Sequence, residues 1–160
     1  MNKLEKALGS QFAKHKESVR TRSFTLGGHT FKVKVPLTKE FEEMQVRMEV
    51  IDDEIIDIYY QDLIKDLEES ESCHITEDDV LVDGNSMKAA ATNKRILEQR
   101  ITELFRLLVP EEPDFDMANI TYPMIDELFP LPIQLQVIKS ISETVSPDTR
   151  KQRENNGVSP

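Results

Sequence analysis

The sequence contains little of the chemistry on which secreted and membrane proteins depend. Cys73 is its one cysteine, so an internal disulfide framework is excluded and a reducing, cytosolic setting is indicated. No apolar run approaches the ~20 residues that a membrane-spanning helix needs. The first residues carry charge throughout and lack an apolar core, which is not typical of a secretory signal. These absences predict a protein of the cytoplasm that does not enter a membrane.

Candidate metal ligands are few and do not converge. The three histidines are scattered, and Cys73 is adjacent to His74 rather than at the spacing that a zinc site uses. A calcium loop beginning at Asp79 would need an oxygen-bearing side chain at Leu81 and a glutamate at Ala90, and neither is present. We therefore expect no metal and no cofactor.

Catalytic motifs are missing as well. The chain has no Gly-x-Ser-x-Gly, and Gly27-Gly28 is not followed by the Lys-Ser/Thr of a phosphate loop. Asp53 and Asp57 lie one helical turn apart, which leaves a metal-dependent enzyme on the face from Asp52 to Asp57 as a rival hypothesis. We interpret these acids as a solvated helix face and expect no enzyme.

Basic residues are nearly absent from the middle of the chain. Residues 1–40 have a net charge of +6, whereas residues 41–86 hold two basic and sixteen acidic groups, a net of −14. Residues 87–160 add −2, which gives the total of −10. The acidic middle would repel phosphates, so nucleic acid is not an expected partner. The pattern indicates solvated helix faces or a polar surface for another protein.

A tight hairpin is predicted between Ser23 and Val35. Gly27-Gly28 tolerate the positive φ angles of a two-residue type I′ loop, which pairs Leu26 with His29 and Phe24 with Phe31. Alternation gathers the apolar side chains on one face: Phe24, Leu26, Phe31, Val33 and Val35. The turn and the hydrophobic pattern thus predict the same register, and Pro36 ends the strand.

A long acidic helix is predicted to follow, with Thr38 as its N-cap and its end near Glu69. Its apolar residues recur at alternating spacings of three and four, as in a helical seam: Phe41, Met44, Met48, Ile51, Ile55 and Ile58. Methionine adapts to irregular partners. The pattern leaves open whether this seam is core or interface.

The second half predicts further helices with one short strand. Residues 68–79 read as a polar loop, residues 80–82 as a strand closed by Asp83-Gly84, and residues 87–108 as a helix capped by Ser86 or Asn85. Thr121 begins a short helix, and Pro132 lies in the first turn of a final apolar helix.

The predicted fold class is α+β, mainly helical, with a small N-terminal β-hairpin. We expect a single domain over residues 21–146, a basic and marginally ordered leader over residues 1–20, and a disordered tail over residues 147–160.

The order of elements resembles the tail assembly chaperones of long-tailed bacteriophages. The resemblance covers Ser23 to Val145 and is carried by a hairpin ("SFTLGGHTFKVKVPL"), a helix start ("TKEFEEM") and a terminal helix after a Pro-rich break ("FPLPIQLQVIKSISETV"). It implies a small, acidic, mostly helical protein of the host cytoplasm. Members of the family bind the tape-measure protein, keep it soluble and help recruit tail-tube subunits, and a frameshifted longer form often extends the C-terminus.

A chaperone of this kind needs an adaptable apolar groove with a charged rim. On this interpretation the groove is formed by Phe41, Met44, Met48 and Ile51, and the rim by Glu42, Glu43, Asp52 and Asp53. Self-association is left open. The rival functions are an acidic interaction module or DNA mimic that inhibits a nucleic-acid-binding enzyme, and a small structural component of a virion.

Overall fold

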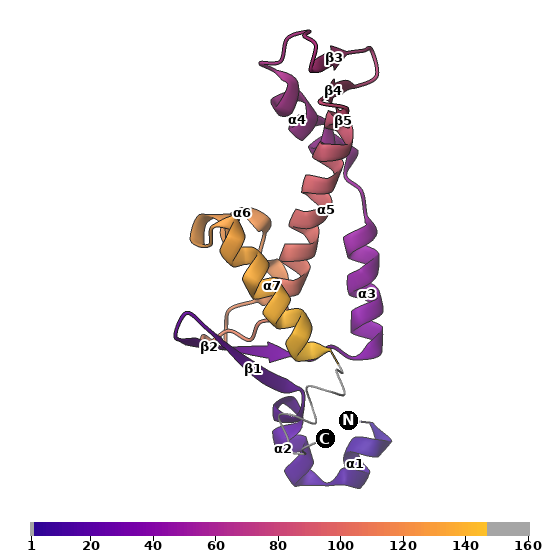
Figure 1. Cartoon of the computed structure of the whole chain (residues 1–160). Coiled ribbons are helices and arrows are strands. Elements are labelled where there is room, and N and C mark those ends of the chain that lie inside the picture. Colours follow the sequence, from indigo (N-terminus) through magenta and orange to yellow (C-terminus); the bar gives the residue numbers. More distant parts are fainter. Residues whose placement is uncertain (1, 147–160) are drawn as a thin grey trace, which may run out of the picture. The chain divides into compact units, whose positions relative to one another are not determined.

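The computed structural model describes residues 2–146 and has the expected fold class, a mainly helical α+β protein (Figure 1). Its contacts group the chain into two compact units. Unit 1 contains Met1–Glu42 and Ile101–Pro160, and unit 2 contains Glu43–Arg100. The single domain expected over residues 21–146 stays a prediction. Within the described residues, no helix is long and apolar enough to cross a membrane.

The N-terminal segment of unit 1 consists of two helices, α1 (Lys3–Leu8) and α2 (Ser10–Val19). Gly9 separates them at a φ of 94°, a left-handed value that favours glycine. Neither helix contains a buried residue. The basic leader is therefore helical without contributing to a core, and the predicted tail over residues 147–160 lies outside the described residues.

The predicted hairpin is confirmed in loop, register and face. Strands β1 (Thr21–Leu26) and β2 (His29–Lys34) pair antiparallel, with Leu26 opposite His29 and Phe24 opposite Phe31. Gly27 and Gly28 have φ angles of 60° and 81°, as a type I′ turn requires. The phenyl rings of the Phe24–Phe31 pair stack at 5.2 Å between centroids.

Unit 1 builds its core by packing the final helix on this hairpin. Helix α7 (Leu131–Val145) contacts both strands, and Val33, Val137 and Ile141 are fully buried. Arg22 fastens β1 to the helix end, because its Nη1 donates to the Thr144 carbonyl oxygen at 2.9 Å. The predicted final helix is confirmed, as is the short helix before it, α6 (Tyr122–Leu128), which follows the 3₁₀ turn η1 (Met117–Asn119).

The prediction of one helix from Thr38 to about Glu69 is wrong. Two helices occupy this stretch, α3 (Thr38–Glu49) and α4 (Asp53–Ile64). The Asp52 carboxylate accepts the amides of Glu54 and Ile55 at 3.2 and 3.3 Å, so it caps α4 and separates the helices. The sequence pattern does not reveal this break, because the apolar residues keep their spacing of three and four across the three residues that connect the helices.

The predicted polar loop over residues 68–79 is wrong at Cys73–Ile75. That segment is strand β3, which pairs with the predicted strand β4 (Val80–Val82), and β4 pairs in turn with β5 (Asn85–Ser86). Asp83 and Gly84 close the second turn with φ angles of 51° and 81°. The core of unit 2 lies beneath this sheet and contains the buried residues Tyr60, Cys73, Val80 and Ala91.

Helix α5 (Met87–Phe105) begins as predicted, because the Ser86 hydroxyl accepts the Ala89 amide at 3.0 Å. It ends before the predicted Leu108. The Lys34 amide donates to the Leu107 carbonyl, and the Val109 amide donates to the Lys32 carbonyl, each at 2.8 Å. Pairing with the free side of β2 therefore replaces the last helical turn.

Candidate partner-binding surface

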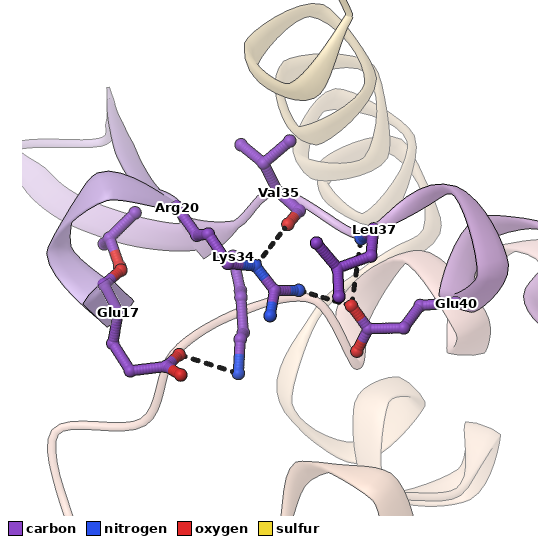
Figure 2. Close-up of polar contacts among 7 residues, drawn as sticks. Glu17, Arg20, Lys34, Val35, Leu37 and Glu40 are labelled. Atoms are coloured by element: carbon purple, nitrogen blue, oxygen red, sulfur yellow. Dashed lines mark hydrogen bonds and ion pairs between the residues drawn. The ribbon is translucent and has the colours of Figure 1, made fainter. Parts of the chain in front are cut away.

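The start of α3 is held to the hairpin by a network of polar contacts (Figure 2). Arg20 connects the two parts, since its Nε donates to the Val35 carbonyl at 3.1 Å and its Nη2 pairs with Glu40. Glu40 in turn accepts the Leu37 amide at 2.9 Å. This amide hydrogen bond, reinforced by Arg20, lowers the pKa of Glu40 below its usual value of 4.5.

The same contacts correct the predicted helix cap. Phe41 donates its amide to the Leu37 carbonyl, so Leu37 rather than Thr38 precedes the helix. Because Leu37 has no polar side chain, Glu40 in the first turn reaches back to its amide instead, which is half of a capping box. The N-cap Leu37 has no polar side chain to cap α3. The start of α3 is held instead by Glu40 and by Arg20, which is distant in the sequence.

A second ion pair supports the base of the hairpin. The Lys34 ammonium lies 2.9 Å from the Glu17 carboxylate, which connects β2 to α2 (Figure 2). The hydrogen bond and the positive charge of Lys34 lower the pKa of Glu17. The junction of α2, the hairpin and α3 is thus held by two carboxylates with lowered pKa values. It positions the segment that bears the predicted partner-binding residues.

The predicted apolar groove does not lie on one exposed face. Met44 is buried at 3% exposure, whereas Phe41 is 45% exposed and Met48 is half-buried. Ile51 is exposed but lies in the connection after α3 rather than on the helix. Met44 therefore belongs to the interior, and Phe41 and Ile51 are the members of the set that reach solvent.

The predicted acidic rim is divided by function in the same way. Glu42 and Glu43 are exposed on α3, as the sequence suggested. Asp52 is the N-cap of α4 and uses its carboxylate within the chain, while Asp53 is the exposed first residue of that helix. Asp53 and Asp57 both reach solvent. No group of three or more His, Cys, Asp or Glu able to hold a metal ion lies within residues 2–146.

Two valines that do not belong to the predicted seam are the more exposed apolar residues on α3 and directly after it. Val46 is 63% exposed and Val50, directly after the helix, is 56% exposed. A step of two residues along a helix turns about 200°, which places Val46 on the side opposite the buried Met44. The signal in the sequence was their spacing of four, outside the Phe41–Ile58 seam. Val46 and Val50 together are hereafter called the Val46–Val50 patch.

A second group of exposed apolar side chains lies at the α6–α7 connection of unit 1. It contains Met124, Leu128, Leu131 and Leu135. Ile125 and Leu128 are both apolar residues of α6, three positions apart. In the structure Ile125 is buried, whereas Leu128, the last residue of the helix, is 73% exposed.

Unit 2 also contains a buried polar group that the sequence analysis did not single out. Glu98 is buried, accepts a hydrogen bond from the Tyr59 hydroxyl and lies 3.6 Å from the Arg95 guanidinium. Burial, followed by the hydrogen bond to Glu98, raises the pKa of Tyr59 to about 12. Lys94 lies over the Tyr59 ring at 4.4 Å from its centroid. The arrangement joins α4 to α5.

The distribution of charge separates the two units. Unit 2 carries sixteen acidic and six basic residues, a net of −10, whereas unit 1 carries fourteen of each sign. The whole net charge of the protein therefore lies on residues 43–100. The chain matches no protein-family model, no curated protein and no solved structure.

Proposed function

We propose that the protein is a non-enzymatic assembly chaperone that acts in the host cytoplasm and binds the tape-measure protein and tail-tube subunits of a long-tailed bacteriophage. The observation that carries the proposal is the Val46–Val50 patch. Exposed apolar side chains on a helix form a surface on which an apolar stripe of another helix can be buried.

The charge of unit 2 supports the same function. The patch belongs to the unit with a net charge of −10, so a complex formed there keeps strong like-charge repulsion between its copies. In such a complex, one apolar stripe of a long, aggregation-prone helical partner is buried, and the negative charge of unit 2 makes the complexes repel one another. The buried Met44 serves the fold, and partner binding is assigned instead to three exposed residues of unit 2: Val46, Val50 and Ile51, the last being a member of the original set.

Co-expression with a tape-measure protein tests the proposal. We expect the chaperone to raise the soluble yield of its partner and to co-elute with it in size-exclusion chromatography. The double variant Val46→Ser/Val50→Ser should weaken the complex by roughly tenfold or more, because full burial of each valine contributes about 1.5 kcal/mol or more. Both residues are exposed, so the variant should fold normally.

The matched control is Leu4→Ser. Leu4 is 66% exposed, like Val46, but lies on α1, so its replacement should leave the complex unchanged. The proposal fails if the partner gains no solubility and forms no complex. It also fails in its location if Leu4→Ser and the double valine variant weaken binding equally.

The concentration of charge in unit 2 favours one alternative, an acidic DNA mimic. Carboxylates of residues 43–100 would then replace phosphates on a nucleic-acid-binding enzyme. That function requires tight, salt-sensitive binding to a basic protein that DNA displaces, and it does not require the valines. A small structural component of the virion, by contrast, would persist in purified particles.

A further inference from the structure

The outer edge of β1 has an unused set of backbone hydrogen-bonding groups. The Val35 amide donates to the Arg20 carbonyl, which fixes the phase of pairing between the hairpin strands. In an antiparallel ladder the paired and unpaired positions alternate. Arg22, Phe24 and Leu26 therefore direct their amides and carbonyls toward β2, while Thr21, Ser23 and Thr25 direct theirs away from it.

The contacts of β2 confirm this phase independently. Lys34 and Lys32 are the partners of Thr21 and Ser23 in the register, and their groups bond Leu107 and Val109 on the far side of β2. The corresponding groups of Thr21, Ser23 and Thr25 have no backbone partner within residues 2–146. Ser23 and Thr25 are exposed, so the free edge is accessible.

We propose that β1 pairs antiparallel with β1 of a second copy, forming a continuous four-stranded sheet across a two-fold axis at Ser23. This register is the one in which all three outward residues of both strands meet, since Ser23 faces Ser23 and Thr21 faces Thr25 of the other copy. Each facing pair exchanges two hydrogen bonds, so six bonds use every free group of the two strands.

Side-chain chemistry favours a second copy over an unrelated strand. Across the axis, Thr21 faces Thr25 and Ser23 faces Ser23, and hydroxyl pairs of this kind are favourable on a sheet surface. The same register places Arg22 opposite Phe24 rather than opposite Arg22, so like charges do not meet. Strand edges are commonly protected by charged side chains, proline or a bulge; β1 contains no lysine, proline or bulge, and the backbone groups of its one charged residue, Arg22, are directed toward β2.

The charge distribution permits this contact. Unit 1 has no net charge, whereas the full −10 lies on unit 2. The contact would thus be made by unit 1, which has no net charge as a whole, although residues 1–40, which contain the hairpin, carry +6. The edge residues of β1 are also different residues from the Val46–Val50 patch, so separate substitutions can test self-association and the proposed chaperone function.

Sedimentation and light scattering over a range of concentrations test the dimer. We expect the wild-type mass to rise toward that of two chains, and Ser23→Pro to remain a monomer. The Ser23 amide points outward, so proline removes an edge donor without breaking a bond to β2. Ser23→Thr keeps the donor and suits a strand, so it should dimerise like the wild type.

Cysteine cross-linking tests the register even if Ser23→Pro fails to fold. Facing residues of a hydrogen-bonded pair lie about 5.5 Å apart between Cα atoms, within the range of about 4.4–6.8 Å that a disulfide bridges. Ser23→Cys should therefore form a covalent dimer under mild oxidation. Thr25→Cys should not, because the two copies of residue 25 are more than about 13 Å apart. The native Cys73 is buried and gives no background.

Three results would overturn the proposal. If the wild-type protein stays monomeric at every concentration, the edge of β1 does not pair with a second copy, and a strand of another protein becomes the candidate partner. A dimer that persists in a folded Ser23→Pro variant forms through a different surface. Equal cross-linking of Ser23→Cys and Thr25→Cys excludes a two-fold axis at Ser23.

Discussion

The two units of the protein differ in how their chain is assembled. Unit 2 is one continuous segment, Glu43–Arg100, whereas unit 1 joins the first part of the chain to the last. The small sheet of unit 2 is made from neighbouring strands, but the hairpin of unit 1, Thr21–Lys34, packs on α7, Leu131–Val145, near the other end of the described chain. Unit 1 therefore depends on distant packing, and unit 2 on local turns and a buried polar group.

Ile141→Ala should produce the largest effect and should act on unit 1. Ile141 is fully buried in α7, and truncation of such a side chain costs about 2–5 kcal/mol. Amide hydrogen exchange should show reduced protection in the hairpin and α7. Leu135→Ala on the same helix removes an exposed side chain and should cost less than about 1 kcal/mol. Equal loss of protection in unit 2 would mean that the units unfold together and that their distinction has no energetic meaning.

Tyr59→Phe should act on unit 2 and by a smaller amount. It removes the hydroxyl that donates to the buried Glu98, and loss of a donor to a buried acceptor costs about 1–3 kcal/mol. Tyr60→Phe is the matched control, since the Tyr60 hydroxyl makes no hydrogen bond within the described residues. Urea unfolding near neutral pH measures both, and equal losses would exclude Glu98 as the cause.

The same tyrosine gives unit 2 a dependence on alkaline pH. Burial raises the pKa of Tyr59 from 10.0 to about 12, so its contribution to stability is complete below pH 10. Between pH 10 and about 12 the unfolded chain loses the proton more readily, and stability falls. Tyr59→Phe should remove the part of this loss of stability that comes from Tyr59. Urea unfolding between pH 10 and about 12 measures the difference. An unchanged slope would contradict the raised pKa.

Glu40→Gln should have the smallest effect and should act where the hairpin of unit 1 meets α3. The Glu40 side chain of the pair with Arg20 is 48% exposed, so loss of its charge should cost below about 1 kcal/mol near neutral pH. The lowered pKa of Glu40 means that its contribution is present above pH 4.5 and disappears as the pH falls through the folded value. The difference from the wild type should close in acid. Glu42→Gln, an exposed neighbour, should show no such difference.

The features that the sequence determined by itself are those fixed by neighbouring backbone. Gly27-Gly28 set the hairpin register because the φ angles that they adopt suit only a two-residue turn of one type. Ser86 fixes the start of α5, and Pro132 lies in the first turn of α7. The break at Asp52 is equally local, but the regular spacing of the seam concealed it.

Tertiary structure decided which apolar residues are interior and which strands exist at all. Met44 and Val46 are both apolar residues of α3, and packing alone buries the first and exposes the second. Strand β3 exists because β4 supplies its partner. Helix α5 ends at Phe105 because the next residues pair with β2, a strand some seventy residues earlier. A sequence pattern shows periodicity and turn residues. It does not show which distant segment packs against an apolar helix face or pairs with a strand edge.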